Sequence, residues 1–151
     1  MPWPAIMTAS AAMSAKEQNC SASSRRTPTA TARCRWQESN IDECEEVRRG
    51  GVKLPVLMLG FTPADQAERI LELDMTQAVQ SLDIAEAFSD AAVKCGKKMK
   101  VHIKLDTGMG RLGFPCDEAN FAQSLADILA VLRLPGLDVE GIFTHFCVSD
   151  E

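Results

Sequence analysis

Residues 104–114 read Lys-Leu-Asp-Thr-Gly-Met-Gly-Arg-Leu-Gly-Phe. They continue a segment from Met99 in which apolar and polar residues alternate, and the sequence predicts a strand over residues 99–106. Two glycines and an arginine follow, where the backbone has to turn and can approach a ligand closely. Parallel α/β barrels place their active sites at such turns, after the carboxyl ends of strands. The stretch therefore predicts a strand that leads into a ligand-binding turn.

One face of this strand is polar. The alternation of side chains along a strand places His102, Lys104 and Asp106 on the same side. Burying a charged group is costly unless the group is paired, so two interpretations are open. The three side chains line an active site, or Lys104 and Asp106 form an internal ion pair with His102 as a satisfied interior residue. For His102 the second interpretation is favoured.

Outward from this strand, helices and strands alternate. Asn40, Thr62 and Asp83 are the expected first residues or caps of three helices. The predicted helices cover residues 41–49, 63–73, 83–96 and 117–132, and the predicted strands cover residues 55–59, 76–82, 99–106 and 139–144. Alternation at about 25 residues per pair predicts parallel strands with right-handed crossovers. About four βα units form half of an eight-stranded barrel, or an open doubly wound sheet. Because the sequence stops just after the fourth strand, we expect a chain truncated at its C-terminus.

Composition narrows the function classes. The chain has 151 residues, a net charge of -5 and 46% hydrophobic residues, typical of a globular domain. No apolar stretch approaches the roughly 20 residues of a membrane-spanning helix, and no basic surface for nucleic acid is expected. The six cysteines form no Cys-x-x-Cys pair, so we expect reduced thiols, a cytoplasmic location and no metal site.

The first 38 residues differ from the rest. Residues 1–40 are rich in Ala, Ser and Thr and lack a sustained apolar period, so the sequence predicts a disordered or aberrant segment over residues 1–38. A transit peptide is the alternative interpretation. Residues 39–151 are expected to form the partial barrel domain.

The string at residues 104–114 resembles the central motif of the alanine racemases, barrel-type enzymes that use pyridoxal phosphate (PLP). Residues 140–146, Glu-Gly-Ile-Phe-Thr-His-Phe, and residues 39–82 resemble other parts of the same family. The resemblance covers about residues 39–151. It implies a partial PLP-binding (β/α)8 TIM-like barrel and an isomerase that interconverts L- and D-alanine and supplies D-alanine for peptidoglycan. It also implies alanine as the small-molecule substrate and a homodimer.

The resemblance assigns roles to three residues. Arg111 is similar to the family arginine that orients the substrate carboxylate and a catalytic tyrosine. Lys104 is similar to a lysine that is often carbamylated and steadies that arginine. His145 is similar to the histidine that packs against the pyridine ring of PLP. The resemblance thus gives Arg111 and Lys104 as catalytic residues and His145 as a cofactor-binding residue.

Two groups of the family pattern are missing from this sequence. The family carries its Schiff-base lysine in a Lys-x-(Asn or Asp)-Ala-Tyr-Gly motif, whereas the only lysine before residue 39 is Lys16, in a different context, and the chain has no tyrosine. The chain as given is therefore expected to be inactive. The alternatives are a non-enzymatic truncated or mispredicted product, and a fragment of a related racemase of serine or of several amino acids. A reading-frame error over residues 1–38 would explain the missing lysine motif.

Overall fold

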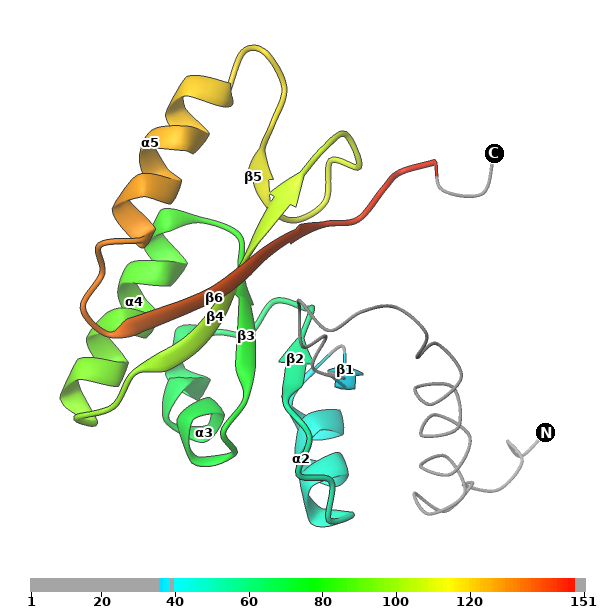
Figure 1. Cartoon of the computed structure of the whole chain (residues 1–151), viewed down its shortest axis with the longest axis vertical. Coiled ribbons are helices and arrows are strands. Elements are labelled where there is room, and N and C mark those ends of the chain that lie inside the picture. Colours follow the sequence, from blue (N-terminus) through cyan, green and yellow to red (C-terminus); the bar gives the residue numbers. More distant parts are fainter. Residues whose placement is uncertain (1–35, 39, 149–151) are drawn as a thin grey trace, which may run out of the picture.

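The computed structural model of the protein describes residues 36–38 and 40–148. These residues form one curved β-sheet with helices along one side (Figure 1). Strands and helices alternate along the chain as predicted. The elements are β1 (Trp36–Glu38), α2 (Ile41–Arg49), β2 (Val56–Met58), a 3-10 turn (Ala64–Gln66), α3 (Ala67–Glu72), β3 (Thr76–Val79), α4 (Leu82–Lys94), β4 (Met99–Asp106), β5 (Phe114–Pro115), α5 (Phe121–Val131) and β6 (Leu137–Thr144).

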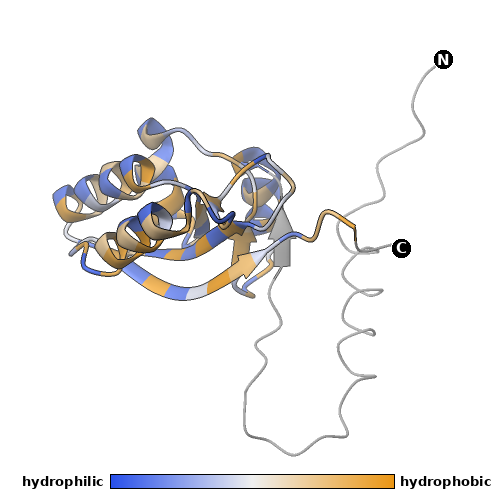
Figure 2. Ribbon diagram, turned by 90° about the horizontal axis from the view of Figure 1, so that it is seen from above, coloured by the Kyte–Doolittle hydropathy of each residue, from blue (hydrophilic) through white to orange (hydrophobic). Residues whose placement is uncertain are grey.

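The order of the strands distinguishes a barrel from a doubly wound sheet. Strands β1, β2, β3 and β4 are neighbours in chain order, and β6 pairs with β4, all in parallel. A doubly wound sheet would reverse this order at a switch point and place helices on both faces. Figure 2 shows the described helices on one side of the sheet, as in a barrel wall. The partial TIM-like barrel with about four units is therefore confirmed.

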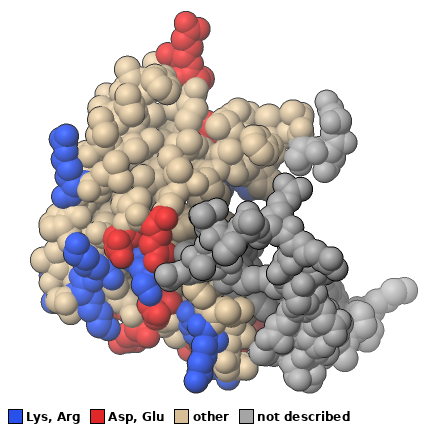
Figure 3. Space-filling view, viewed as in Figure 1, with Lys and Arg blue, Asp and Glu red and all other residues tan. Residues whose placement is uncertain are grey.

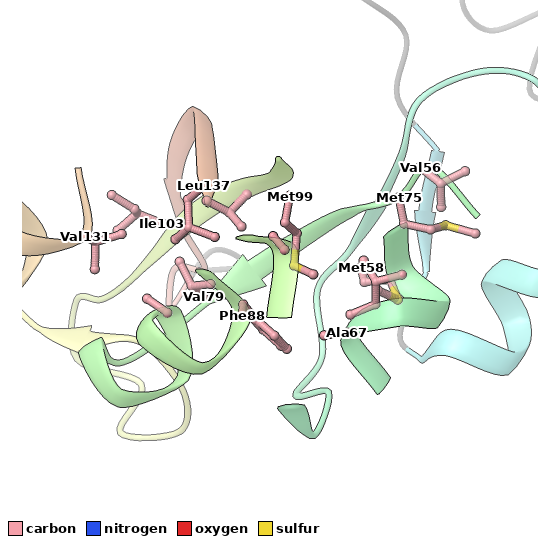
Figure 4. Packing of buried hydrophobic residues seen from close by; sticks show 14 of the residues in the cluster. Val56, Met58, Ala67, Met75, Val79, Phe88, Met99, Ile103, Val131 and Leu137 are labelled. Carbon is pink, nitrogen blue, oxygen red and sulfur yellow. The ribbon is translucent and has the colours of Figure 1, made fainter. Parts of the chain in front are cut away.

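The apolar core lies between the sheet and the helices. Figure 4 shows Phe88 of α4 among side chains that project from several strands, including Val79 and Met99. Phe88, Met99, Val101 and Ile103 are all at most 2% exposed. Alternate residues of β4 thus face the helices, and His102, Lys104 and Asp106 face the opposite side of the sheet.

Helix α2 begins and ends where the sequence predicts. The Asn40 side chain accepts hydrogen bonds from the backbone N–H groups of Asp42 and Glu43, at 3.0 Å each. The Glu43 carboxylate accepts in return from the N–H of Asn40, which completes a capping box. The helix ends at Arg49, next to Gly50, so local signals are sufficient to set both of its ends.

Several predicted starts were wrong; strand β6, for example, starts at Leu137 rather than at residue 139. Thr62 is buried and Pro63 precedes a 3-10 turn, so the α-helix starts only at Ala67. Strand β3 ends at Val79 and α4 starts at Leu82, because the apolar Leu82 packs on the core from the helix rather than from the strand. Helix α5 starts at residue 121 rather than at residue 117.

The late start of α5 has a specific cause. The Asp117 carboxylate accepts from the backbone N–H groups of Ala119 and Asn120, at 3.0 and 3.1 Å. A side chain that binds its own backbone in this way stabilises a turn in place of a helix. The turn occupies residues 117–120, and the helix follows it.

The sequence analysis did not predict two short strands. β5 has two residues, and β1 lies at residues 36–38, before the boundary expected at residue 39. The backbone of β1 pairs with that of β2, so the sheet includes the end of the segment expected to be disordered. The rest of that segment lies outside the described residues. Within residues 36–38 and 40–148, no helix combines the length and apolar character needed to cross a membrane.

Candidate active site

A cavity of about 430 Å³ opens where β2, β4 and β6 end. It brings together the three predicted site residues: Lys104 from β4, Arg111 from the following turn, and His145 just after β6. The remaining lining residues are Leu59, Gly60, Leu112, Phe143 and Thr144. In Figure 1 the carboxyl ends of β4 and β6 and the turn after β4 lie in the upper part of the molecule.

Lys104 is a buried cation in this cavity. The residue is 5% exposed, and its Nζ lies 5.9 Å from the centre of the Phe143 ring. No hydrogen bond or ion pair joins its Nζ to another residue of the described part of the chain. Burial lowers the pKa of the Lys104 amine, and repulsion from Arg111 lowers it further, while Asp106 partly opposes the shift. The neutral form of the amine is therefore more favourable at Lys104 than at a lysine on the surface.

The carboxylate of Asp106 accepts hydrogen bonds from the turn after β4 and forms no ion pair with Lys104. Its Oδ1 accepts from the backbone N–H groups of Gly108 and Gly110, at 3.1 and 3.0 Å, and its Oδ2 accepts from the N–H of Arg111 at 3.0 Å. These bonds, led by that of Gly110, lower the pKa of the Asp106 carboxyl. Among the described residues, the Lys104–Asp106 ion pair considered from the sequence is not formed.

His102 lies outside the cavity. Its Nε2 is 4.0 Å from Oε2 of Glu140, and the same oxygen accepts from the Thr76 hydroxyl at 3.3 Å. A Cβ at residue 141 would approach the imidazole to 3.0 Å, so Gly141 lets β6 pack directly on the ring. His102 is therefore an interior residue, as the sequence favoured.

Threonines that the sequence analysis did not select join the two strand ends at the site. The hydroxyls of Thr107 and Thr144 lie 2.8 Å apart, and the Thr144 hydroxyl also donates to the carbonyl oxygen of Leu105 at 3.1 Å. These contacts hold the end of β6, and with it His145, beside the turn that carries Arg111. The signal was present only as two threonines at strand ends, a pattern too common to select them.

The arrangement suits an anionic ligand. Two basic side chains, Lys104 and Arg111, border the cavity, and the carboxylate of Asp106 beside them is occupied by backbone N–H groups. His145 adds an imidazole that can stack on a planar ring. These residue types fit part of PLP, which has a phosphate and a pyridine ring. Within the described residues, no group of three or more His, Cys, Asp or Glu is placed to hold a metal ion.

Comparison with known families agrees with this geometry. The family model for the N-terminal domain of alanine racemase matches residues 20–151. The chain belongs to the alanine racemase N-terminal domain family. The match begins 19 residues before the boundary expected at residue 39, so the alanine racemase likeness extends into the atypical N-terminal segment.

Individual alanine racemases are similar to most of the chain. Those of Clostridium perfringens and Desulforamulus reducens are 43% and 45% identical over 111 and 113 residues, or 74% and 75% of this chain. The structure of the Clostridium difficile alanine racemase in complex with cycloserine superposes with a TM-score of 0.72 and 36% identity over 78% of the chain. The chain covers 28%, 30% and 31% of these three proteins, respectively. It therefore spans about a third of the length of the alanine racemases that it matches.

Proposed function

We propose that the chain is part of the PLP-binding barrel of an alanine racemase that interconverts L- and D-alanine and supplies D-alanine for peptidoglycan. The observation that carries the proposal is the convergence of Lys104, Arg111 and His145 on one cavity at the carboxyl ends of parallel strands. In this proposal residues 39–151 belong to the barrel domain, and the whole enzyme is a cytoplasmic homodimer.

Arg111 would orient the substrate. Its guanidinium makes no hydrogen bond or ion pair with the described residues, so its donors remain available to a ligand in the cavity. A guanidinium binds a carboxylate through two parallel hydrogen bonds, which fixes the direction of the bound amino acid. The carboxylate of alanine has the required shape and charge.

Lys104 would act as a carbamate. Its lowered pKa makes the neutral amine available, and a neutral amine attacks CO₂ to form an N–C bond with release of one proton. The product carries a negative charge in place of a positive one. That change removes the repulsion with Arg111 and gives the guanidinium an anionic neighbour that steadies it.

His145 would pack against the cofactor ring, with Arg111 supplying positive charge to the same cavity. When bound, PLP withdraws electrons from the α-carbon of an amino acid and so makes the α-proton acidic. The chain has no tyrosine, so the second proton-transfer group of the family has to come from outside these 151 residues. We expect no racemisation by the chain alone.

The test starts from the gene. Translating the flanking DNA in all frames shows whether a Lys-x-(Asn or Asp)-Ala-Tyr-Gly motif precedes these residues and whether a tyrosine-bearing domain follows them. The longest product that contains both is then purified with PLP, and racemisation is measured with L-alanine and with L-serine. We expect alanine to be the better substrate.

Arginine variants of the same product test the assigned site. Arg111→Lys keeps the charge but loses the planar fork, so kcat/KM should fall by about 100-fold. Arg133→Lys, in the exposed loop after α5, is the matched control and should leave the rate unchanged. Faster turnover of serine would favour the related racemase. No turnover of either amino acid, or interrupted reading frames, would favour the non-enzymatic product.

A further inference from the structure

Three parts of Asp106, its carboxylate, its backbone carbonyl and its backbone nitrogen, contact the turn that follows β4. Its carboxylate binds three N–H groups within the turn, and its backbone carbonyl accepts from the N–H of Cys116 at 2.9 Å. The returning chain also packs on it, because a Cβ at residue 113 would lie 2.6 Å from the Asp106 backbone nitrogen. Asp106 is thus the common point of contact for the start, the middle and the end of the turn.

The glycines of the turn make this convergence possible. Gly108 and Gly110 have φ values of +124° and +67°, which side-chain-bearing residues rarely adopt. Successive N–H groups in such conformations point inward and form a concave binding site for an anion. Here the anion is a side chain of the protein itself, so the turn is preorganised before any ligand arrives.

Arg111 depends on this turn for its position. Its own side chain has no hydrogen-bond partner among the described residues, whereas its backbone N–H is held by Oδ2 of Asp106 at 3.0 Å. The backbone therefore determines where the guanidinium can reach into the cavity. We propose that Asp106 is the positioning residue for Arg111, and that its carboxylate fixes the turn so that the guanidinium meets the substrate carboxylate. This role rests on the proposed function.

Asp106→Asn tests the contact in the 151-residue chain. The amide keeps one acceptor oxygen but presents an NH₂ group to the Arg111 N–H, so this one hydrogen bond is lost. Hydrogen exchange of the Arg111 amide should accelerate by about tenfold. Asp117→Asn is the matched control, because Asp117 also accepts backbone N–H groups, but in the turn before α5 and not in the one that carries Arg111. It should leave the Arg111 amide unchanged.

A second pair of variants covers the case in which Asp106→Asn does not fold. Gly110→Ala and Gly96→Ala both place an alanine at a φ near +65° with no atom within 4 Å of the new Cβ. The backbone strain is therefore nearly the same at both sites. Only Gly110→Ala should accelerate exchange of the Arg111 amide.

A double-mutant cycle in the PLP-loaded product described above tests the consequence for catalysis. Asp106→Asn should lower kcat/KM for alanine by about tenfold, but by less than about threefold when Arg111 is already lysine, because both changes act through one guanidinium. Equal effects in the two backgrounds, or an unchanged exchange rate for the Arg111 amide, would overturn the inference. If the unmodified product does not racemise alanine, the proposed function fails, and the exchange rates alone decide whether Asp106 holds the turn.

Discussion

Two arginines at opposite ends of the sheet have opposite environments. Arg48 lies where the strands begin, and its guanidinium donates to the carbonyl oxygens of Val52, Leu54, Leu73 and Asp74 at 2.7 to 2.9 Å. Arg111 lies where the strands end, and its guanidinium has no partner among the described residues. The amino-end arginine uses its donors within the fold, whereas the donors of the carboxyl-end arginine have no partner among the described residues, as the proposed ligand-binding role requires.

Other polar groups differ between the two ends of the sheet in the same way: they are paired where the strands begin, and the Lys104 amine is not paired with any described residue where the strands end. At the amino end, Gly136 donates to the Ser89 hydroxyl at 3.0 Å, and Lys100 pairs with Asp74 at 2.6 Å. Figure 3 shows charged side chains of both signs gathered over the lower part of this face, where the strands begin. At the carboxyl end, the buried Lys104 has no anionic partner in the described structure. Barrel enzymes divide stability and activity between the two ends of their strands in this way.

The largest expected effect on stability comes from Gly136→Ala at the amino end. The new Cβ would lie 2.1 Å from the carbonyl oxygen of Ser89, so α4 and the start of β6 must move apart. We expect a loss of about 3 kcal/mol in the free energy of unfolding, measured by urea denaturation. Gly51→Ala, with φ +85° and open space around it, should cost about 1 kcal/mol. Equal losses would show that the contact with α4 adjusts easily.

Arg48→Met should have the next largest effect. The substitution keeps an unbranched apolar stem but removes four hydrogen bonds that join the loops before β2 and β3, so we expect a loss of about 2 kcal/mol. Arg49→Met is the control on the same helix, since its exposed ion pair with Glu45 should contribute less than about 0.5 kcal/mol. Unfolding curves of the two variants that coincide would contradict the structural role of Arg48.

Lys104→Met should change stability less, and in the opposite direction. Replacing a buried cation by an apolar side chain of similar size should leave the protein equally stable or up to about 1 kcal/mol more stable at pH 7. Lys100→Met is the control on the same strand and should be slightly destabilising through the loss of its ion pair with Asp74. Urea unfolding in CO₂-free buffer measures both variants. A clear loss for Lys104→Met would indicate that the cation has a stabilising partner.

The effect of Lys104 also depends on pH. Its pKa is lower in the folded than in the unfolded chain, so the unfolded chain binds more protons between the lowered pKa and the ordinary value of 10.5. The wild-type protein should therefore gain stability relative to Lys104→Met as the pH rises through that window. A difference that stays constant with pH would show that the amine is not desolvated.

Arg111→Lys should have the smallest effect on stability. Because no described residue accepts a hydrogen bond from the guanidinium, the free energy of unfolding should change by less than about 0.5 kcal/mol. This outcome, combined with a large loss of turnover in the PLP-loaded product, would sharpen the contrast with Arg48. A fall in the unfolding midpoint comparable to that of Arg48→Met would instead make Arg111 a structural residue.

The sequence alone determined the parts of the fold that local signals encode. The capping residues of α2 lie at or next to the helix ends, and the alternation of residues 99–106 gives both the length of β4 and its two faces. The string at residues 104–114 and the one at residues 140–146 also gave the family. The placement of Lys104, Arg111 and His145 in one cavity follows from that family likeness, since parallel strands bring their carboxyl ends to one edge.

Only the tertiary structure decided which groups become hydrogen-bond partners and which strands pair. Asp106 and Asp117 are both carboxylates beside a turn, yet the sequence pattern left an ion pair with Lys104 open for the first and started a helix at the second. Both instead bind backbone N–H groups that their own turns bring within about 3 Å. The strands β1 and β5 are likewise too short to have a period and exist through pairing with distant backbone. Periodicity and caps record local geometry, whereas a partner is set by distances between groups that meet only after the chain has folded.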